Sequence, residues 1–274
     1  MGPESYQLKF HPKRNGSATG RKTRSTAGIG LAIVKGLAKE GASVIVNGRS
    51  TKRVEEALAA LNKAGVSGRL EGLAADLGTA DGTRTMIEGY PEVEILVNNL
   101  SVFETKSFEN IPDADWLRLF EVNILSGVRL SRHYLPRMKH RNWGRIVFIS
   151  SESAIQIPTE MIHYGMTKTA QLAIARGLAE TTAGTHVTVN SVLPGPTASE
   201  GVNNFVEELA RDQKTTRQEV EEQFFQNMRP TSLLKRMAEP EEVANLVTFV
   251  CSPRSSATNG AALRVDGGVV RSIL

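Results

Sequence analysis

Apolar and polar positions along the chain switch repeatedly between helical and strand spacing. Apolar residues at Ile29, Ile33 and Leu37 recur at the spacing of one helix face, which predicts a helix over 28–40 that stops at Gly41. The apolar run at 42–48 predicts the strand that follows it. The same unit of helix and strand is repeated to the end of the chain.

The other elements are predicted from the same two spacings. Strands are expected at 69–77, 93–99, 144–151, 186–195 and 261–268, and helices at 51–64, 81–89, 113–139 (broken near Pro136), 161–182 and 240–251, with a polar, helix-prone insertion at 197–237. Strands that alternate with helices predict an α/β fold with one doubly wound parallel sheet and helices on both faces. Ligands of such sheets bind beyond the carboxyl ends of the strands, so functional residues are expected there.

Composition narrows the class of protein without changing this fold. The 274 residues, 40% hydrophobic and 23% charged, are expected to form one globular domain. No apolar run approaches the roughly 18–20 residues that span a bilayer, and no secretory signal is visible, so no membrane association is expected. The single cysteine, Cys251, fits a reducing, cytoplasmic location, and five scattered histidines predict no metal site.

The positive charge is concentrated at one end of the chain. Residues 1–24 contain six basic residues and one acidic residue, a net charge of +5, whereas the whole chain carries +4, so the remainder is near neutral at −1. Nucleic-acid binding needs basic residues spread over a folded face. No nucleic-acid partner is therefore expected.

Three polar residues near one strand end could carry acid–base chemistry. Tyr164 and Lys168 are four positions apart in "YGMTK", so they share a face of a helix, and Ser151 ends a strand 13 residues earlier. A free tyrosine has a pKa of about 10, and a nearby ammonium lowers that pKa. With a serine hydroxyl to hold a substrate oxygen, these residues could move a proton to or from a carbonyl compound. A solvent-facing helix pair is the alternative for the tyrosine and lysine alone.

From Ser25 onward the chain resembles the short-chain dehydrogenase/reductase (SDR) family. The motifs that carry the resemblance are "STAGIG" at 25–30, "ADL" at 75–77, "VNN" at 97–99, "VNILSG" at 122–127, "ISSES" at 149–153, "YGMTK" at 164–168, "NSVLPGPT" at 190–197 and "VDGG" at 265–268. Each is weak alone, but their order and intervals are specific. The resemblance implies a single Rossmann-type domain over 25–274, with 197–237 as a substrate lid, and a dimer or tetramer of identical chains.

The resemblance also implies a catalytic tetrad. Ser151 would orient the substrate carbonyl, and Tyr164 would act as the general acid/base. Lys168 would lower the pKa of Tyr164 and hold the nicotinamide ribose, and Asn123 would hold a water in a proton relay. The reaction implied is hydride transfer between NADP(H) and a small-molecule carbonyl or secondary alcohol.

Cofactor contacts follow from the same resemblance. Gly28 and Gly30 would let the backbone approach the pyrophosphate at a helix N-terminus. Asp76 would face the adenine, Asn99 the adenosine ribose, and Thr197 the carboxamide or pyrophosphate; a helix N-cap is the alternative for the aspartate. The other residues expected at the cofactor are Ser25, Ile29, Asn47, Arg49, Leu77, Tyr164, Lys168, Pro194 and Gly195.

The end of the strand at 42–48 indicates which nicotinamide cofactor is used. NAD-binding members generally place an acidic residue there to bind the ribose 2′-hydroxyl, whereas this chain has Gly48 followed by Arg49, with Lys52 and Arg53 in the next turn. An arginine suits a 2′-phosphate, so NADP(H) is expected. The alternative is that Arg49 is an exposed loop residue.

Apolar residues near the expected site indicate a partly apolar substrate. Candidates for the pocket wall and the lid, each with core packing as the alternative, are Phe103, Ile155, Ile157, Met161, Phe205, Leu209, Phe224, Phe225 and Met228. A 3-oxoacyl-carrier-protein reductase is one specific option, because Arg137, Lys139 and Arg141 are expected near the entrance. Thr185, where such reductases usually carry a basic residue, counts against that option.

The segment before Gly28 departs from the family pattern. Arg24 stands where the family has its first glycine, and the expected apolar strand reads "SATGRK" at 17–22. A strand buried on both faces tolerates such basic residues poorly, because burying an unpaired charge costs several kcal/mol.

Three explanations of this departure are open. Thr19 and Gly20 could begin a longer, basic loop; the segment could reflect a local reading-frame slip or a cloning artefact; or tight cofactor binding could be lost. The abrupt return of family character at Ser25 favours the second. A non-catalytic SDR-fold scaffold, with cofactor binding impaired by the basic segment, is the alternative function.

Overall fold

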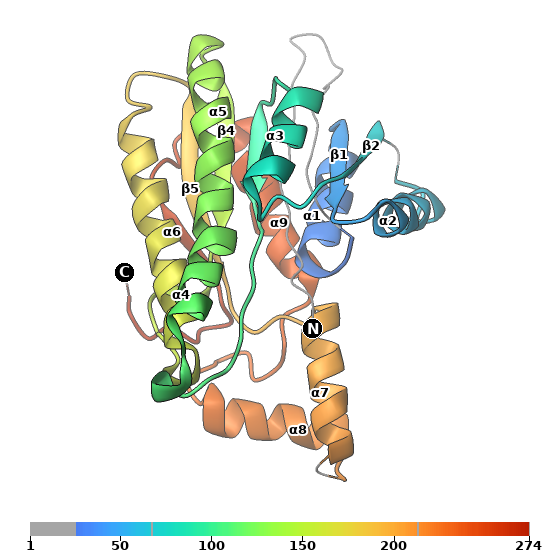
Figure 1. The fold of residues 1–274 in the computed structure, drawn as a ribbon, viewed down its shortest axis with the longest axis vertical. Helices are drawn as coiled ribbons and strands as arrows, with labels where there is room; N and C mark the ends of the chain where they lie inside the picture. The colour runs from blue at the N-terminus through green and yellow to red at the C-terminus, as the bar shows by residue number, and fades with distance from the viewer. Residues whose placement is uncertain (1–25, 67, 213, 274) are drawn as a thin grey trace.

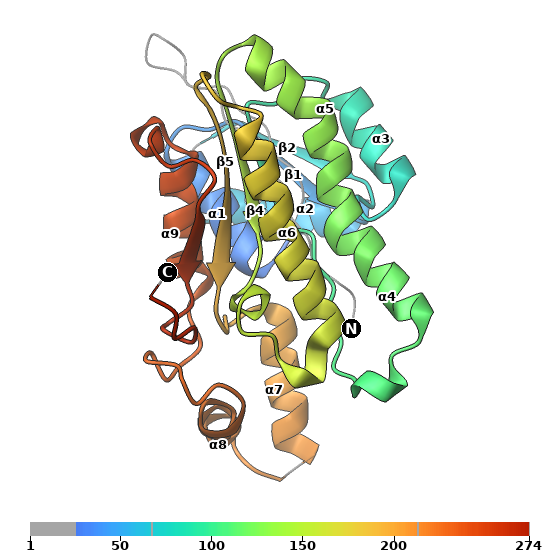
Figure 2. The ribbon, with the colours of Figure 1, turned by 90° about the vertical axis from the view of Figure 1, so that its left-hand side faces the viewer.

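Helices and strands alternate along the chain in this computed structural model, which describes residues 26–66, 68–212 and 214–273. Ser25 and the basic segment 1–24 lie outside the described residues, and so does the strand expected before Gly28. The described chain forms a parallel sheet with helices on both faces (Figures 1 and 2). The expected α/β fold class is therefore confirmed.

The strands of the described residues form two hydrogen-bonded parts. They are β1 (Val44–Gly48), β2 (Leu70–Ala74), β3 (Ile95–Asn98), β4 (Gly144–Ile149), β5 (Val187–Pro194) and β6 (Ala262–Val265). β1 pairs with β2, and β3, β4, β5 and β6 pair in that order, always in parallel. All strands therefore end at the same edge of the sheet.

The helices cover the two faces and the carboxyl edge of this sheet. They are α1 (Gly28–Lys39), α2 (Thr51–Lys63), α3 (Ala80–Gly89), α4 (Asp113–Phe120), α5 (Ser126–His140), α6 (Ile162–Glu180), α7 (Glu200–Asp212), α8 (Arg217–Gln223) and α9 (Pro240–Cys251). Among them, α7 and α8 lie beyond the carboxyl ends of the strands, away from the two main helical layers (Figures 1 and 2).

Side chains of the strands alternate between two apolar clusters. On β3, Ile95 and Val97 join the cluster with α1, α2 and α9, whereas Leu96 joins the cluster with α3, α5 and α6. The first cluster contains residues of both β1 and β3, so it connects the two parts of the sheet. Cys251 of α9 is fully buried in it.

The helix expected at 113–139 differs from the structure in the position of its break. Pro136 lies inside the continuous helix α5, whereas a single π-helical turn, η2 (Glu121–Leu125), separates α4 from α5. Such turns often accompany functional sites. The expected stop at Gly41 is confirmed, because this glycine adopts a φ of 86° directly after the end of α1.

The described residues contain neither of two features that would point to another class of protein. Their helices include none with the length and hydropathy of a membrane span. Three or more His, Cys, Asp or Glu side chains are nowhere grouped among them as metal ligands would be.

Candidate active site

The four residues expected to form a catalytic site are brought to the carboxyl edge of the sheet. Ser151 follows the end of β4, and Tyr164 and Lys168 lie one helical turn apart near the start of α6. Asn123 lies in the π-helical turn η2, which is packed against α6. Three separate segments of the chain thus supply one site.

Tyr164 lies between an aromatic ring and a buried ammonium group. Its ring centroid is 6.0 Å from that of Phe103 and 5.5 Å from Nζ of Lys168. Burial raises the pKa of the Tyr164 phenol well above its ordinary value, and the Glu152 carboxylate raises it further. The nearby hydroxyls of Ser151 and Ser101 act in the opposite direction but do not outweigh burial.

Lys168 is almost completely buried, with 1% of its surface exposed. Its Nζ donates hydrogen bonds to the carbonyl of Ile149 at 3.0 Å and to Oε1 of Gln171 at 3.4 Å. Burial lowers the pKa of Lys168 to about 7, partly opposed by the charge of Glu152. The lysine therefore lies close to its own titration midpoint at neutral pH.

Asn123 is held by protein groups on every side. Its Nδ2 donates to the Val102 carbonyl at 2.9 Å and to Oγ1 of Thr167 at 3.0 Å, and its Oδ1 accepts from the Val102 amide at 2.7 Å. Its main-chain carbonyl accepts a hydrogen bond from Nε2 of Gln171 at 2.7 Å. Gln171 therefore bridges Asn123 and Lys168, the pair that the resemblance connects through a water.

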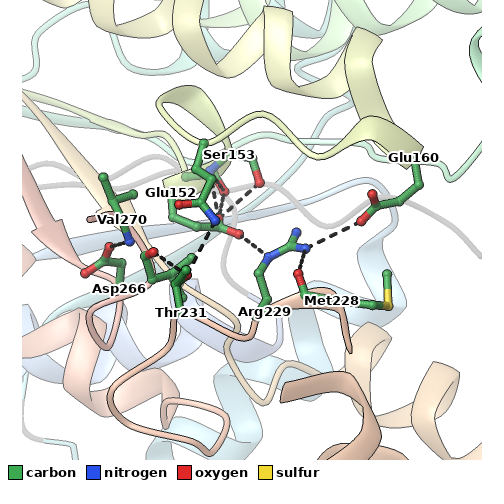
Figure 3. A network of polar contacts seen from close by, with 12 residues as sticks. Glu152, Ser153, Glu160, Met228, Arg229, Thr231, Asp266 and Val270 are labelled. Atoms are coloured by element: carbon green, nitrogen blue, oxygen red, sulfur yellow. Dashed lines mark hydrogen bonds and ion pairs between the residues drawn. The ribbon is translucent and has the colours of Figure 1, made fainter. Parts of the chain in front are cut away.

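Ser151 is positioned by the short 3-10 turn η3 (Glu152–Ala154) that follows it. Its Oγ accepts a hydrogen bond from the Ser153 amide at 3.1 Å and donates one to Oε2 of Glu152. The same carboxylate binds Arg229 from the segment after α8, as Figure 3 shows. A buried ion pair thus adjoins the serine.

The start of α1 has the features of an anion-binding helix terminus. Gly28 adopts a φ of 55°, which favours glycine, and no side chain caps the first turn after Ala27. The uncapped N–H groups and the helix dipole can bind a phosphate. Ile29 and Gly30 continue this turn, so the described part of the motif fits a dinucleotide, while Ser25 lies outside it.

The end of β1 offers a site for a second phosphate. A Cβ at Gly48 would lie only 2.8 Å from a methyl of Val54 and 3.2 Å from one of Thr26, so an acidic side chain would fit there only if these neighbours shifted. Arg49 is exposed and makes no hydrogen bond or ion pair with the described residues. Its guanidinium is therefore available to a ligand.

The remaining residues expected near adenosine differ in what they can offer. The amide of Asn47 is fully buried and donates to the carbonyl of Leu73 in β2 at 2.9 Å and to that of Ala75, directly after β2, at 3.0 Å, so it stabilises the sheet. Asp76 is exposed, and its Oδ1 accepts from the Gly78 amide at 3.0 Å; the N-cap of α3 is Thr79 instead. The aspartate is thus not a helix cap.

Two further residues that were expected to contact the cofactor are Leu77 and Asn99. Leu77 is completely buried in the cluster beside α3, so it can offer a ligand only its backbone. Asn99 is 7% exposed and directly follows the end of β3 at the carboxyl edge.

The end of β5 brings the chain close to that of β6. Pro194 is the last residue of β5, and a Cβ at Gly195 would lie 2.5 Å from the Asp266 carbonyl oxygen. Only glycine fits this approach without a shift. Thr197 is buried, and its Oγ1 donates to the Gly195 carbonyl at 2.9 Å.

Apolar side chains near the site are unusually exposed. Phe103, Ile155, Ile157 and Met228 expose 57%, 43%, 47% and 44% of their surfaces, so they are not packed in the core. Phe225, in contrast, is buried. Met161 and Phe224 are partly buried, and the side chains of Phe205 and Leu209 lie outside the described ones.

The expectation that basic residues of α5 lie near the entrance is wrong. Arg137, Lys139 and Arg141 are in the last turn of α5 and just after it, which lead into the start of β4 at the opposite edge of the sheet. Arg141 and Arg137 are paired there with Glu92. Thr185 precedes β5 at that same far edge.

Three polar residues at the site were missed in the sequence. They are Glu152, Gln171 and Arg229. A carboxylate directly after the candidate serine in "ISSES" was a visible signal, because a charge beside a buried strand end needs a partner. The partner of that carboxylate, 77 positions away, left no local signal.

Comparison with known proteins assigns the chain to a family. A family model described as "Enoyl-(Acyl carrier protein) reductase" matches residues 24–270. The chain is 51% identical to "Uncharacterized oxidoreductase YvaG" of Bacillus subtilis, covering 92% of this chain and 95% of that protein. It is 32% identical to the 3-oxoacyl-[acyl-carrier-protein] reductase FabG of Aquifex aeolicus, covering 90% and 95%. The chain therefore belongs to the short-chain dehydrogenase/reductase family of oxidoreductases.

Solved structures of oxidoreductases have the same fold. L-sorbose reductase from Gluconobacter frateurii, solved with NADPH and L-sorbose, superposes with a TM-score of 0.85 at 30% identity, covering 92% of this chain and 96% of that one. Actinorhodin polyketide ketoreductase, solved with NADPH, gives a TM-score of 0.80 at 27% identity, covering 91% and 95%.

Proposed function

We propose that this chain is an NADP(H)-dependent reductase that interconverts a partly apolar small-molecule carbonyl compound and the corresponding secondary alcohol. The observation that carries the proposal is the convergence of Ser151, Tyr164 and Lys168 beyond the sheet, on the same edge as the glycine-rich start of α1. The exposed apolar side chains around Tyr164 support a partly apolar substrate.

The proton would pass through the phenol. Reduction consumes the carbonyl compound, NADPH and one proton, and releases the alcohol and NADP⁺; the nicotinamide supplies the hydride when it is bound. The Tyr164 hydroxyl would donate its proton to the carbonyl oxygen, which Ser151 orients. Because the pKa of Tyr164 is raised, the phenol is protonated at neutral pH, as this direction requires. Oxidation needs the phenolate and should therefore become faster as pH rises.

Three observations support NADP(H) over NAD(H). Gly48 carries no acidic side chain and is crowded by Val54, Arg49 is exposed and unpaired among the described residues, and the two structures compared above were solved with NADPH. A phosphate on the ribose would gain charge-assisted hydrogen bonds from the guanidinium.

The proposal extends to the surroundings of the site. The segment 197–237 would be the substrate lid, since α7 and α8 lie beyond the carboxyl edge of the sheet (Figures 1 and 2). A cytoplasmic assembly of identical chains is also proposed; on α4, Leu117 and Phe120 expose 69% and 42% of their surfaces and could pack against a second copy.

Replacing Tyr164 with Phe tests the proposed chemistry. Loss of the proton donor should lower kcat by about 10²–10⁴-fold, while NADPH binding, followed by fluorescence, stays unchanged. Tyr134→Phe is a matched control. It removes the hydroxyl of a tyrosine on α5, which donates a hydrogen bond to the Tyr90 carbonyl at 2.8 Å. A Tyr164→Phe enzyme with undiminished turnover would exclude this mechanism.

A non-catalytic scaffold is the second candidate, because Arg24 replaces the first glycine of the cofactor motif. The same fluorescence titration separates the two. Saturable NADPH binding supports the reductase, and no binding at millimolar NADPH supports the scaffold.

A further inference from the structure

Glu152 is a buried carboxylate in direct contact with the candidate catalytic serine. Only 4% of its surface is exposed. Its Oε2 accepts hydrogen bonds from the Ser151 hydroxyl, from the Ser153 amide at 2.8 Å and from the Ser153 hydroxyl at 3.1 Å. The carboxylate therefore fixes where the Ser151 hydroxyl points.

The countercharge of this carboxylate comes from a distant part of the chain. Nε of Arg229 lies 3.0 Å from Oε1 of Glu152, and 7% of the arginine is exposed. Nη1 of the same guanidinium donates to the Met228 carbonyl at 2.9 Å and lies 3.5 Å from Oε1 of Glu160 (Figure 3). The guanidinium also lies 5.7 Å from the ring centroid of Phe224.

Arg229 directly follows the π-helical turn η5 (Phe224–Met228), which continues α8. The ion pair thus connects the segment beyond the sheet edge to the loop that holds the serine. A second contact, between neutral side chains, joins the same two parts of the chain: Nε2 of Gln156 donates a hydrogen bond to Oγ1 of Thr231 at 3.4 Å. Both contacts form only when the segment 217–231 lies against that loop.

A buried carboxylate that loses its partner is strongly disfavoured. If the segment 217–231 moved away, Glu152 would have to gain water or a proton, and either change would alter its hydrogen bond to Ser151. The ion pair therefore makes the orientation of Ser151 depend on the docked segment.

We propose that Glu152 and Arg229 are positioning residues, through which docking of the segment 217–231 holds the Ser151 hydroxyl in place for the reaction. The proposal rests on the reductase function proposed above. It deepens that function by adding a charged pair that neither sequence motif nor chemistry of the tetrad requires.

Both charges of this pair act on Tyr164. Replacing either residue should therefore shift the pH dependence of oxidation, which a purely structural ion pair would not do. The groups acting on Tyr164 are Glu152, which disfavours the phenolate, and Arg229, which favours it, together with the serine hydroxyls and the Lys168 ammonium over its ring. Glu160 is bound to the outer side of the guanidinium. Removing the two charges of the pair should thus move the pH dependence of oxidation in opposite directions.

The test compares Arg229→Met, Glu152→Gln and the double variant with the wild type, using NADP⁺ with cyclohexanol and NADPH with cyclohexanone. Arg229→Met should lower kcat about a hundredfold, as expected for a misplaced catalytic group, with NADPH affinity unchanged. The acidic limb of the oxidation profile should move up by about one pH unit in Arg229→Met and down by about one in Glu152→Gln. The double variant should lie between the two.

Arg236→Met is the matched control, because it breaks an exposed ion pair with Glu242 near the same segment. It should leave kcat and the profile unchanged. Hydrogen exchange gives a readout that needs no turnover: the amides of 217–231 should exchange faster in Arg229→Met and remain protected in Arg236→Met. Glu152→Gln keeps an isosteric side chain, so it decides the case if Arg229→Met does not fold.

The proposal would be overturned if hydrogen exchange of 217–231 were unchanged in Arg229→Met. It would also be overturned if the acidic limbs of the two single variants shifted in the same direction or not at all. Failure of the proposed function would look different. An active Tyr164→Phe enzyme would refute the acid–base role of the phenol, and the exchange measurement would still decide whether the pair docks the segment.

Discussion

Gln171 connects two buried residues of the candidate site that lie far apart in the chain. Its amide donates to the Asn123 carbonyl, 48 positions earlier, and its Oε1 accepts from the Lys168 ammonium. With 2% of its surface exposed, the amide has no access to water as a substitute partner. The glutamine therefore holds the π-helical turn and the lysine in one arrangement.

Replacing Gln171 with Leu should disturb both partners at once. The buried carbonyl and ammonium would lose a hydrogen bond, so the free energy of unfolding should fall by about 1–3 kcal/mol. kcat should fall by about tenfold, because each misplaced group costs part of the catalytic geometry. Urea unfolding and steady-state rates measure the two effects. Gln218→Leu, which removes an exposed amide on α8, should change neither.

The depressed pKa of Lys168 predicts a pH dependence of stability. Burial lowers this pKa from 10.5 in the unfolded chain to about 7. Between these values the unfolded state binds the extra proton, so the free energy of unfolding should rise with pH across that window. The cost of burying the charge is fully present below pH 7 and is lost near pH 10.5.

Lys168→Met should remove this contribution. Its stability relative to wild type should be highest at pH 6 to 7 and decline toward pH 10, by an amount on the order of a few kcal/mol. Urea unfolding of both proteins at several pH values provides the measurement. A constant difference across the range would show that Lys168 does not titrate differently in the folded state.

The residue types at the site were predictable, but their pairing was not. Ser151, Tyr164 and Lys168 lie within 18 consecutive residues, and Tyr164 and Lys168 are one helical turn apart, so sequence reasoning could place them together. The expected lowering of the Tyr164 pKa did not follow, since burial and Glu152 raise this pKa by more than the hydroxyls of Ser151 and Ser101 and the charge of Arg229 lower it. The contact of that glutamate with Arg229 depends on how a distant segment packs, which no local pattern encodes.

At the scale of elements, the strands and helices were predicted where periodicity is long and regular. The continuous apolar run of β3 and the glycine that follows the C-terminal end of α1, Gly41, both gave unambiguous signals. The π-helical turn between α4 and α5 did not, because one extra residue in a helix barely changes the hydrophobic spacing. The break expected near Pro136 is absent, because helix α5 continues through this proline.

The close approach of β5 and β6 makes Gly195 a sensitive position. In Gly195→Ala the new methyl would meet the Asp266 carbonyl at 2.5 Å, and the backbone shift should cost about 1–3 kcal/mol of stability. Gly177→Ala on α6 is the matched control, since its Cβ meets nothing within 4 Å and helix propensity should stabilise the protein by about 0.5–1 kcal/mol. Chemical denaturation of the two variants should thus give shifts of opposite sign.

At the scale of the whole molecule, one apolar cluster joins the two groups of paired strands that the structure describes. β1 and β3 contribute Val46 and Val97 to one apolar cluster, which also contains residues of α1 and α9. The fold class could be predicted because it depends only on the alternation of strands and helices along the chain. The basic segment 1–24 lies outside the described residues. Sequencing the coding DNA would test whether its departure from the family pattern comes from a reading-frame slip.

Cys251 gives direct experimental access to this helical layer. It is the chain's one cysteine, and it is fully buried on α9 in the cluster that spans both parts of the sheet. A maleimide or disulfide reagent can reach its sulfur only when that layer opens. The rate of labelling in native buffer therefore measures how often the packing of α9 on the sheet opens, and the measurement needs no mutation.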